Sequence, residues 1–361
     1  MKILLMGFGK LKFMPYMNFY LDNLDRKKHD IHLLCWNRDL KQDAYDALDD
    51  ITIHEYRCYQ EADVPKTEKI KSFAGYRQYA LDLLKKESFD FIFIVHSLTG
   101  IVLWDYISKN YKGKYVFDYR DFTYESFLPF KCVVASLVRG SKFTFVSSDA
   151  YRIYLPQADS NKIYTIHNID SRLSYTNEEN QQAEKPNEKI RIGFWGFIRD
   201  YKINCKIIEQ IGNDNRFVLH YYGREHQICL DLKKYVEENN IQNVFFHGEY
   251  NPNEKAEIIK NTDLIHNLYD DTGAKLAIGN KYYDGLVSGK PQACMPGSYM
   301  GALCKNNSVG FVCNPYTEGF ADKLYNEYNE MLKGNLKENC RKALSVINSQ
   351  QEKNINIIKA I

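Results

Sequence analysis

The stretch IRIGFWGFIRDYK, residues 190–202, contains the local pattern on which the fold prediction rests. Its apolar run over 190–195 predicts a buried strand, Gly196 predicts a tight turn, and the polar residues that follow predict the start of a helix. A strand followed at once by a helix is the building unit of a parallel α/β sheet. The stretch therefore favours an α/β fold, provided that the rest of the chain repeats this unit.

Two basic residues stand where this turn becomes a helix. Arg199 and Lys202 oppose the positive end of the helix dipole unless an anion compensates them. A glycine such as Gly196 lets backbone N–H groups approach a phosphate, which the two cations would neutralise. The pattern predicts a phosphate-binding turn, and a glycine turn followed by solvated charges is the alternative.

Strands separated by helical patterns recur on both sides of this stretch. The predicted strands are 2–6, 31–36, 51–56, 91–95, 114–118, 143–147 and 163–166 before it, and 217–222, 243–247, 263–267, 291–295 and 310–313 after it. The alternation predicts two open, doubly wound parallel-sheet domains in tandem. The expected division is a first domain over 1–170, a polar linker over 171–189, a second domain over 190–335, and a helical tail over 336–361 that could pack back on the first domain.

Composition and charge exclude several classes of protein. Of 361 residues, 44% are hydrophobic and 26% are charged, which is typical of a globular protein, and a net charge of +2 does not suggest a nucleic-acid partner. The nine cysteines are scattered without a C-x-x-C pair, which favours reduced thiols in a cytoplasmic protein. No apolar run reaches the ~20 residues of a membrane span, so we expect the membrane to be met only from its surface.

NKYYDGLVSGKP, residues 280–291, predicts a short helix with a defined start and end. Asn280 suits the N-cap, and Gly289 suits the residue just past the helix. Lys281 and Asp284 are three residues apart and share a face. A lysine in the first turn opposes the dipole, so Lys281 suits a diphosphate better than it suits stability. An exposed ion pair between Lys281 and Asp284 is the alternative.

The order of these pieces resembles the GT-B glycosyltransferases, and among them the large family-four-like group of retaining enzymes that use nucleotide sugars. The residues that carry the resemblance are Gly196, Arg199 and Lys202 after a strand, Gly223 in HYYGRE, Gly248 in VFFHGEY, and Asp284 in DGLVSGKP (284–291). The resemblance implies a GT-B fold, with two Rossmann-like domains that face each other across a cleft. It covers nearly the whole chain.

The resemblance also implies roles for the second half. Arg199 and Lys202 would act in catalysis by neutralising the donor diphosphate, with Lys281 assisting. The glycines 196, 223 and 248 would lie against the donor, and Asp284 would replace the glutamate that usually binds the donor ribose. The family often has a second glutamate eight residues earlier, where this chain has Leu276. Two neighbouring carboxylates could replace it in donor binding, those of Asp270 and Asp271.

The first half carries three further candidate groups. The loop MGFGK, with Gly7, Gly9 and Lys10, resembles the loop that contacts donor or acceptor, and it lacks the third glycine of a dinucleotide fingerprint. A tight strand-to-helix turn is the alternative for this loop.

His96 ends the apolar run 91–95, where many members of the family keep a histidine near the reacting sugar. A hydrogen-bonded structural histidine is the alternative. In DYRDF (118–122), Asp118, Arg120 and Asp121 could line the cleft and meet acceptor hydroxyls. They could also form an ion-pair cluster that holds a loop, which is the favoured interpretation.

The segment SFLPFKCVVASLVRGSK, residues 126–142, is apolar with basic residues at its edges. It could be a surface helix that touches anionic lipid at the inner face of the membrane. Val133, Val134, Leu137 and Val138 also fit the buried stripe of an ordinary crossover helix, which is the favoured interpretation.

Together these patterns predict a glycosyltransferase of the hexosyltransferase type. We expect it to move a sugar from a nucleotide-diphosphate sugar to a hydroxyl of a glycan or polyprenyl-linked glycan acceptor in bacterial capsule, O-antigen or other surface polysaccharide synthesis. The resemblance implies that the anomeric configuration is retained. No cofactor or bound metal is expected beside the nucleotide sugar. The alternatives are a nucleotide-sugar epimerase of the same fold and a non-catalytic nucleotide-sugar-binding subunit. Leu276, which stands where the family often has a glutamate, leaves the binding subunit possible.

Overall fold

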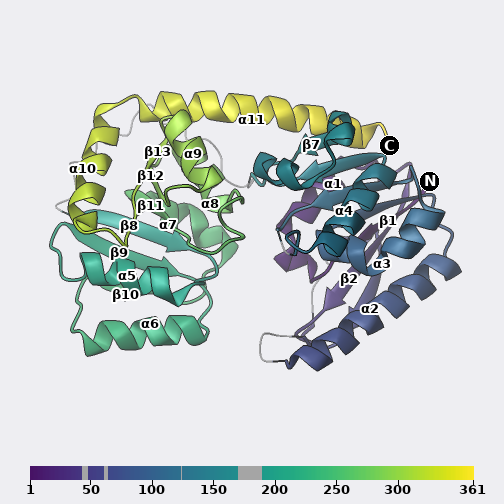
Figure 1. Cartoon of the computed structure of the whole chain (residues 1–361), viewed down its shortest axis with the longest axis horizontal. Helices are drawn as coiled ribbons and strands as arrows, with labels where there is room; N and C mark the ends of the chain where they lie inside the picture. Colours follow the sequence, from purple (N-terminus) through teal and green to yellow (C-terminus); the bar gives the residue numbers. More distant parts are fainter. Residues whose placement is uncertain (43–47, 61–63, 123, 170–188) are drawn as a thin grey trace. The chain divides into compact units, whose positions relative to one another are not determined.

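The computed structural model describes residues 1–42, 48–60, 64–122, 124–169 and 189–361. All but the last residue of the predicted linker, 171–189, lies outside these ranges. The chain divides into two compact units: the first holds Met1–His167 and Ser349–Ile361, and the second holds Asn168–Asn348. Each unit is an α/β layer structure built on its own sheet (Figure 1).

The sheet of the first unit has seven parallel strands in the order β3-β2-β1-β4-β5-β6-β7. The strands are β1 (Lys2–Met6), β2 (Asp30–Asn37), β3 (Thr52–Arg57), β4 (Phe91–Val95), β5 (Tyr115–Tyr119), β6 (Phe143–Val146) and β7 (Ile163–Thr165). Its helices are α1 (Asn18–Asn23), α2 (Lys66–Lys86), α3 (Ser97–Asn110) and α4 (Leu128–Gly140). Because β1 pairs with both β2 and β4, the strand order reverses between β1 and β4, where α/β sheets bind ligands.

The sheet of the second unit has six parallel strands in the order β10-β9-β8-β11-β12-β13. The strands are β8 (Ile190–Trp195), β9 (Phe217–Tyr222), β10 (Val244–Phe246), β11 (Leu264–Asn267), β12 (Gln292–Cys294) and β13 (Gly310–Val312). Its helices are α5 (Tyr201–Ile211), α6 (Gln227–Glu238), α7 (Lys255–Lys260), α8 (Asn280–Ser288), α9 (Tyr299–Asn306) and α10 (Phe320–Lys333). The order again reverses beside the first strand, between β8 and β11.

The central strands of both sheets are buried on both faces, as parallel sheets require. In β1, for instance, Ile3 and Leu5 face a core that includes Tyr20 of α1, while Leu4 and Met6 are equally buried on the other side. The near-continuous apolar runs of the sequence arise from this double burial. All thirteen predicted strands are confirmed, and each end lies within one residue of its predicted position.

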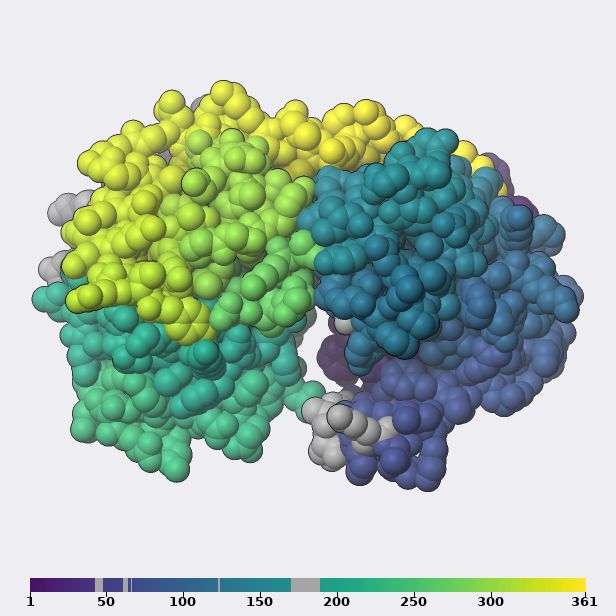
Figure 2. All heavy atoms as spheres, in the orientation of Figure 1, coloured from purple at the N-terminus to yellow at the C-terminus, as the bar shows by residue number. Residues whose placement is uncertain are grey.

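The last helix, α11 (Leu336–Lys359), contributes to both units. Its first half packs on α8 and α9 of the second unit through Cys340, Leu344 and Ile347. Its last turns return to the first unit, where Ile358 lies in the same core as β1. Figure 2 shows this helix at the molecular surface, in yellow.

The segment 126–142, for which the sequence left two interpretations, contains α4. Of the four predicted stripe residues, Val134, Leu137 and Val138 are buried and Val133 is partly buried. The crossover-helix interpretation is therefore confirmed. Phe127 and Leu128, at its start, are 63% and 69% exposed, and contact with a lipid surface stays a prediction. Within the described ranges, every helix is too short or too polar to cross a membrane.

Candidate functional site

Three glycines lie side by side at the carboxyl edge of the second sheet. The Gly196 N–H donates to the carbonyl oxygen of Tyr222 at 2.9 Å, and the Gly223 N–H donates to the carbonyl oxygen of Gly248 at 2.8 Å. Gly196 has a φ of 117°, and a Cβ at Gly223 would lie 2.0 Å from the Gly196 carbonyl oxygen. Only glycine fits both positions, so the backbone turns sharply without side chains above the strand ends.

Two cations stand at the surface just beyond the first of these turns. The Arg199 side chain is 55% exposed, with its Nε 4.0 Å from Asp271 Oδ2 and its guanidinium carbon 5.4 Å from the ring centroid of Tyr269. Lys202 is also exposed, and its ammonium lies 5.5 Å from the ring centroid of Tyr316. Both side chains can therefore reach an anion without leaving a buried partner.

The helix that follows this turn starts in a strained conformation. Asp200, the N-cap of α5, has a φ of 66°, which is uncommon for a residue other than glycine. Its carboxylate accepts a hydrogen bond from the Ile203 N–H at 3.5 Å. This carboxylate offsets part of the unfavourable placement of basic residues at a helix start.

The helix α8 begins one position earlier than its expected cap implies. Gly279 is the N-cap, and its carbonyl accepts from the Tyr282 N–H at 2.9 Å. The prediction that Asn280 caps the helix is therefore wrong, because its side chain turns away to accept a hydrogen bond from Asn168 Nδ2 at 3.3 Å. At the other end, Gly289 has a φ of 63°, which confirms the predicted stop.

Lys281, in the first turn of α8, is 7% exposed. Its ammonium donates to the carbonyl oxygen of Trp195 at 3.2 Å and to the hydroxyl of Tyr269, and it lies 4.0 Å from the ring centroid of Phe194. Trp195 ends β8 and Tyr269 follows β11. The amine thus lies between the two strand ends where the strand order reverses, which is the usual ligand position of an open α/β sheet.

The charge of this lysine is poorly compensated. Burial, together with the Arg199 guanidinium and the Lys255 ammonium, lowers the pKa of Lys281 to about 7, against the opposing effect of Asp284. Its hydrogen-bond acceptors are a carbonyl and a neutral hydroxyl. A bound anion would supply the missing negative charge.

Asp284 is fully buried and pairs with α7. Its Oδ1 lies 2.7 Å from Lys255 Nζ, and its Oδ2 accepts from Trp195 Nε1 at 2.8 Å. The alternative of an exposed pair between Lys281 and Asp284 is therefore wrong. Burial raises the pKa of Asp284, with Lys255 opposing. Each oxygen can accept a further bond, and contact with a ribose stays a prediction.

The two carboxylates expected near the sugar lie close to the exposed cations. Asp271 faces Arg199 and also accepts from the Ala274 N–H at 2.8 Å. Burial, together with the nearby Asp270 carboxylate, raises the pKa of Tyr316 to about 12. Both predicted carboxylates therefore lie among the residues that surround Arg199 and Lys202.

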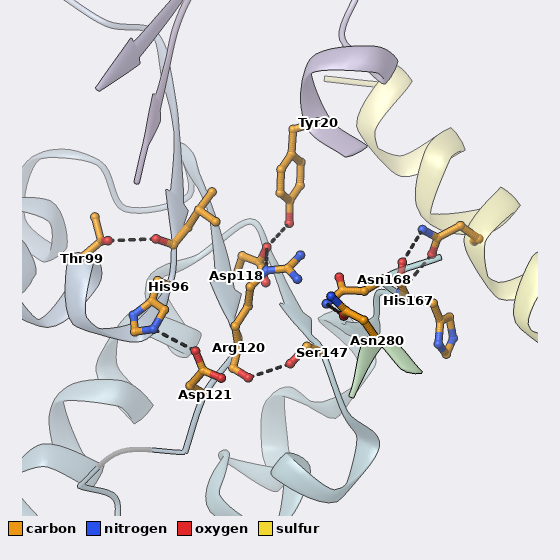
Figure 3. Close-up of polar contacts among 12 residues, drawn as sticks. Tyr20, His96, Thr99, Asp118, Arg120, Asp121, Ser147, His167, Asn168 and Asn280 are labelled. Carbon is orange, nitrogen blue, oxygen red and sulfur yellow. Dashed lines mark hydrogen bonds and ion pairs between the residues drawn. The ribbon is translucent and has the colours of Figure 1, made fainter. Parts of the chain in front are cut away.

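His96 caps a helix at the switch point of the first sheet (Figure 3). It has a φ of 82°, its Nδ1 accepts from the Leu98 N–H at 3.2 Å, and its Nε2 lies 3.0 Å from Asp121 Oδ2. Because Nδ1 is an acceptor, Nε2 carries the proton of the neutral ring and can donate it. The ring is held parallel to Phe8, with centroids 6.3 Å apart.

The predicted pair at the end of β5, Asp118 and Arg120, is buried. Asp118 Oδ2 accepts from Arg120 Nε at 2.8 Å and from the Tyr20 hydroxyl at 2.6 Å (Figure 3). The Arg120 guanidinium carbon lies 4.0 Å from the ring centroid of Tyr16. Burial raises the pKa of Asp118, and Arg120 opposes this. The pair has the geometry of the loop-holding alternative, and contact of either residue with an acceptor stays a prediction.

The loop after β1 is a close-packed turn. A Cβ at Gly7 would lie 2.6 Å from Cε of Met14, whereas Gly9 has more room. Lys10 is 1% exposed, and its ammonium pairs with Asp39. The local geometry is that of a tight strand-to-helix turn, and the contact of these three residues with a sugar stays a prediction.

Sequence reasoning missed three residues that position the site: Trp195, Lys255 and Tyr269. Trp195 is the last residue of β8, and Tyr269 follows β11. Both strands border the switch point, so the position of these residues at strand ends is a signal that the sequence contains. Lys255 has no such signal, because only the packing of α7 against α8 brings it to Asp284.

No family model matches this sequence, and no curated protein matches it. Solved structures do match. Sucrose-phosphate synthase from Thermosynechococcus elongatus superposes with a TM-score of 0.73 at 12% identity, over 99% of this chain and 98% of that one. HepE from Anabaena, in complex with UDP and glucose, gives 0.68 at 14% identity over 100% of both chains. WaaG, a glycosyltransferase involved in lipopolysaccharide biosynthesis, gives 0.60 at 14% identity over 99% of both.

These structures match the chain over nearly its full length, including both sheets. The two parallel-sheet units and this likeness show that the chain has the GT-B fold. At such low identity the likeness establishes the fold alone, and function has to be argued from the site.

Proposed function

We propose that this protein is a glycosyltransferase that moves a sugar from a nucleotide-diphosphate sugar to a hydroxyl of a glycan or lipid-linked glycan, with retention. Bacterial capsule, O-antigen or related surface polysaccharide synthesis is the proposed setting. A likeness of fold to HepE, which was solved with UDP-glucose, supports a nucleotide-sugar ligand without identifying it.

The observation that carries the proposal is the group of cations at the carboxyl edge of the second sheet. Arg199, Lys202 and Lys281 surround the end of β8 and the start of α8, where glycine turns leave the backbone uncovered. Helix N-termini and cations together form a site for a diphosphate. Negative charge grows on that diphosphate as the sugar departs, so the cations stabilise the transition state more than the bound donor.

The other predicted residues take supporting roles in this proposal. Asp284 holds Trp195 and Lys255 in place and approaches the donor ribose. In the first unit, the Nε2–H of His96 donates to a hydroxyl of a sugar ligand in exchange for Asp121. Protein cations and backbone N–H groups then supply the electrostatic stabilisation, so the proposed mechanism requires no bound metal.

Alanine substitution of the exposed cations tests the proposal. Arg199→Ala and Lys202→Ala should each lower kcat/KM by about 10²–10³-fold, because each removes a charge that stabilises the leaving diphosphate. Transfer and donor hydrolysis are measured with a panel of UDP-, GDP- and dTDP-sugars. The matched control is Lys234→Ala, which removes an exposed lysine from α6 of the same unit and should leave turnover unchanged.

A non-catalytic nucleotide-sugar-binding subunit is the second candidate. Leu276, at the position where the resembled family often has a glutamate, is the observation that favours it. The two candidates separate in the unsubstituted protein. A donor that raises its melting temperature without any transfer or hydrolysis, across the panel, would establish the binding subunit and overturn the enzyme.

A further inference from the structure

The groups around the Lys281 amine leave it with an excess of positive charge. The charged and titratable side chains that face it are Arg199 on the turn after β8, Lys255 on α7, Asp284 on α8, His266 on β11 and Tyr269 after β11, with Asp271 beside Arg199. Burial lowers the pKa of His266 to about 3 and raises that of Tyr269 well above its ordinary value, so both are neutral near pH 7.

Among the described residues, the carboxylate that acts most directly on this amine, that of Asp284, is already neutralised. Both oxygens of Asp284 have partners, the Lys255 ammonium and the Trp195 indole N–H. Asp271 is paired with the more exposed Arg199. Within the part of the chain that the structure describes, the acceptors of Lys281 are two uncharged oxygens; the amine lies above the face of Phe194, and the residue is 7% exposed. Near neutral pH such an amine loses its proton readily unless an anion arrives.

We propose that Lys281 takes up one proton from solvent when the diphosphate of a nucleotide sugar binds beside it. This inference rests on the proposed function, which places the diphosphate there. The incoming negative charge and the desolvated amine stabilise each other, so donor binding and protonation of this lysine are coupled. The balance is one proton moved from buffer to Nζ for each donor bound.

The coupling has a defined pH range. With a pKa of about 7 in the free protein, the amine is mostly neutral at about pH 8 and mostly charged at about pH 6. Uptake should therefore be roughly 0.9 proton per donor at the higher pH and roughly 0.1 at the lower one. Donor affinity should fall up to about tenfold for each pH unit above 8, since binding then consumes a proton.

Isothermal titration calorimetry of UDP-glucose into the full chain tests this. A pyrophosphate diester has no group that titrates near neutral pH, so the donor itself contributes no proton. Binding enthalpy is measured in buffers of different ionisation enthalpy at each pH, and the slope gives the protons taken up. If UDP-glucose does not bind, the same titration uses the GDP-, dTDP- and ADP-sugars.

Three variants make the result specific. Lys281→Met removes the titrating amine and should abolish the uptake. Lys281→Arg keeps a permanent charge and should bind without uptake, which tests the idea even if the methionine variant folds poorly. Lys202→Met, the exposed cation of the same site, should bind more weakly with its uptake unchanged.

Failure of the proton coupling and failure of the proposed function would give different results. Donor binding whose enthalpy does not depend on the buffer at either pH, or an uptake that persists in Lys281→Met, would overturn the coupling and leave the proposed function intact. Absence of binding for every nucleotide sugar of the panel would overturn the proposed function, and the coupling with it.

Discussion

At the scale of single residues, the three cations of the candidate site are in different physical states. Arg199 and Lys202 remain in water and can swing toward a ligand, whereas Lys281 is held below the surface by Trp195 and Tyr269. An arginine keeps its charge at any physiological pH, while a buried lysine does not. Lys281 therefore makes the charge of the site depend on pH near neutrality.

The burial of Lys281 should also be visible in stability. Between its folded pKa of about 7 and the ordinary value of 10.5, the unfolded chain binds more protons than the folded chain, so the free energy of unfolding rises with pH. The contribution is at most roughly 1.4 kcal/mol per pH unit over this range. Below about pH 7 the amine is protonated in both states, and its contribution no longer changes.

Lys281→Met should remove the part of the rise in unfolding free energy with pH that this lysine causes. The measurement is urea unfolding of parent and variant, followed by circular dichroism between about pH 6.5 and 10, and the quantity compared is the difference between the two proteins. Lys234→Met, an exposed lysine on α6, controls for the loss of a lysine. A parent-minus-variant difference that is constant across this range would show that Lys281 is not desolvated in the folded protein.

At the scale of elements, α8 is held from both sides by side chains that the sequence does not pair. Its second turn carries Asp284, which binds the Lys255 ammonium at the start of α7 and the indole N–H of Trp195 at the end of β8. This buried network fixes the helix relative to the strand ends. A buried pair is costly to break and of little net value compared with apolar packing.

A double-mutant cycle should reveal the energetic interaction between Asp284 and Lys255. Asp284→Asn and Lys255→Met should each destabilise the second unit by about 3–5 kcal/mol, because each leaves a buried partner uncompensated. The double variant should lose less than the sum of the two. The free energies come from urea unfolding, and additive losses would contradict a direct pair. Lys234→Met again serves as the surface control.

At the scale of the whole molecule, the chain ends in the unit where it began. The second unit interrupts the first, and α11 carries the chain from one to the other. Ile358 lies in the core of β1, and Asn354 Nδ2 donates to the carbonyl oxygen of Thr165 at 2.6 Å. The last residues are therefore a structural part of the first unit.

Truncating this contact should weaken the first unit in particular. Ile358→Ala should cost about 2–5 kcal/mol, because it removes buried methyl groups and leaves a cavity. Val346→Ala, at a 61% exposed position of the same helix, should change stability by less than about 0.5 kcal/mol. Hydrogen exchange should rise in β1 and β2 of the Ile358 variant, and a rise confined to residues 190–335 would contradict this assignment.

Most of the fold could be predicted from the sequence because parallel strands leave a local signature. A run such as FIFIV (91–95) is apolar throughout since both faces of the sheet are covered, and its ends are marked by polar or glycine residues. Two doubly wound domains followed from the alternation, and the GT-B fold was implied by the resemblance that the order of the glycine turns carries. The glycines 196, 223 and 248 could be found because backbone turns restrict residue type locally.

What the sequence determined by itself is thus the set of strands, the turns between them, and the presence of basic residues at one turn and one helix start. Tertiary structure alone decided which of these cations lie in water. Lys281 became buried, and Asp284 was matched to Lys255, through packing between elements distant in sequence. Desolvation and ion pairing depend on every neighbour in space, and a sequence pattern records only the neighbours along the chain.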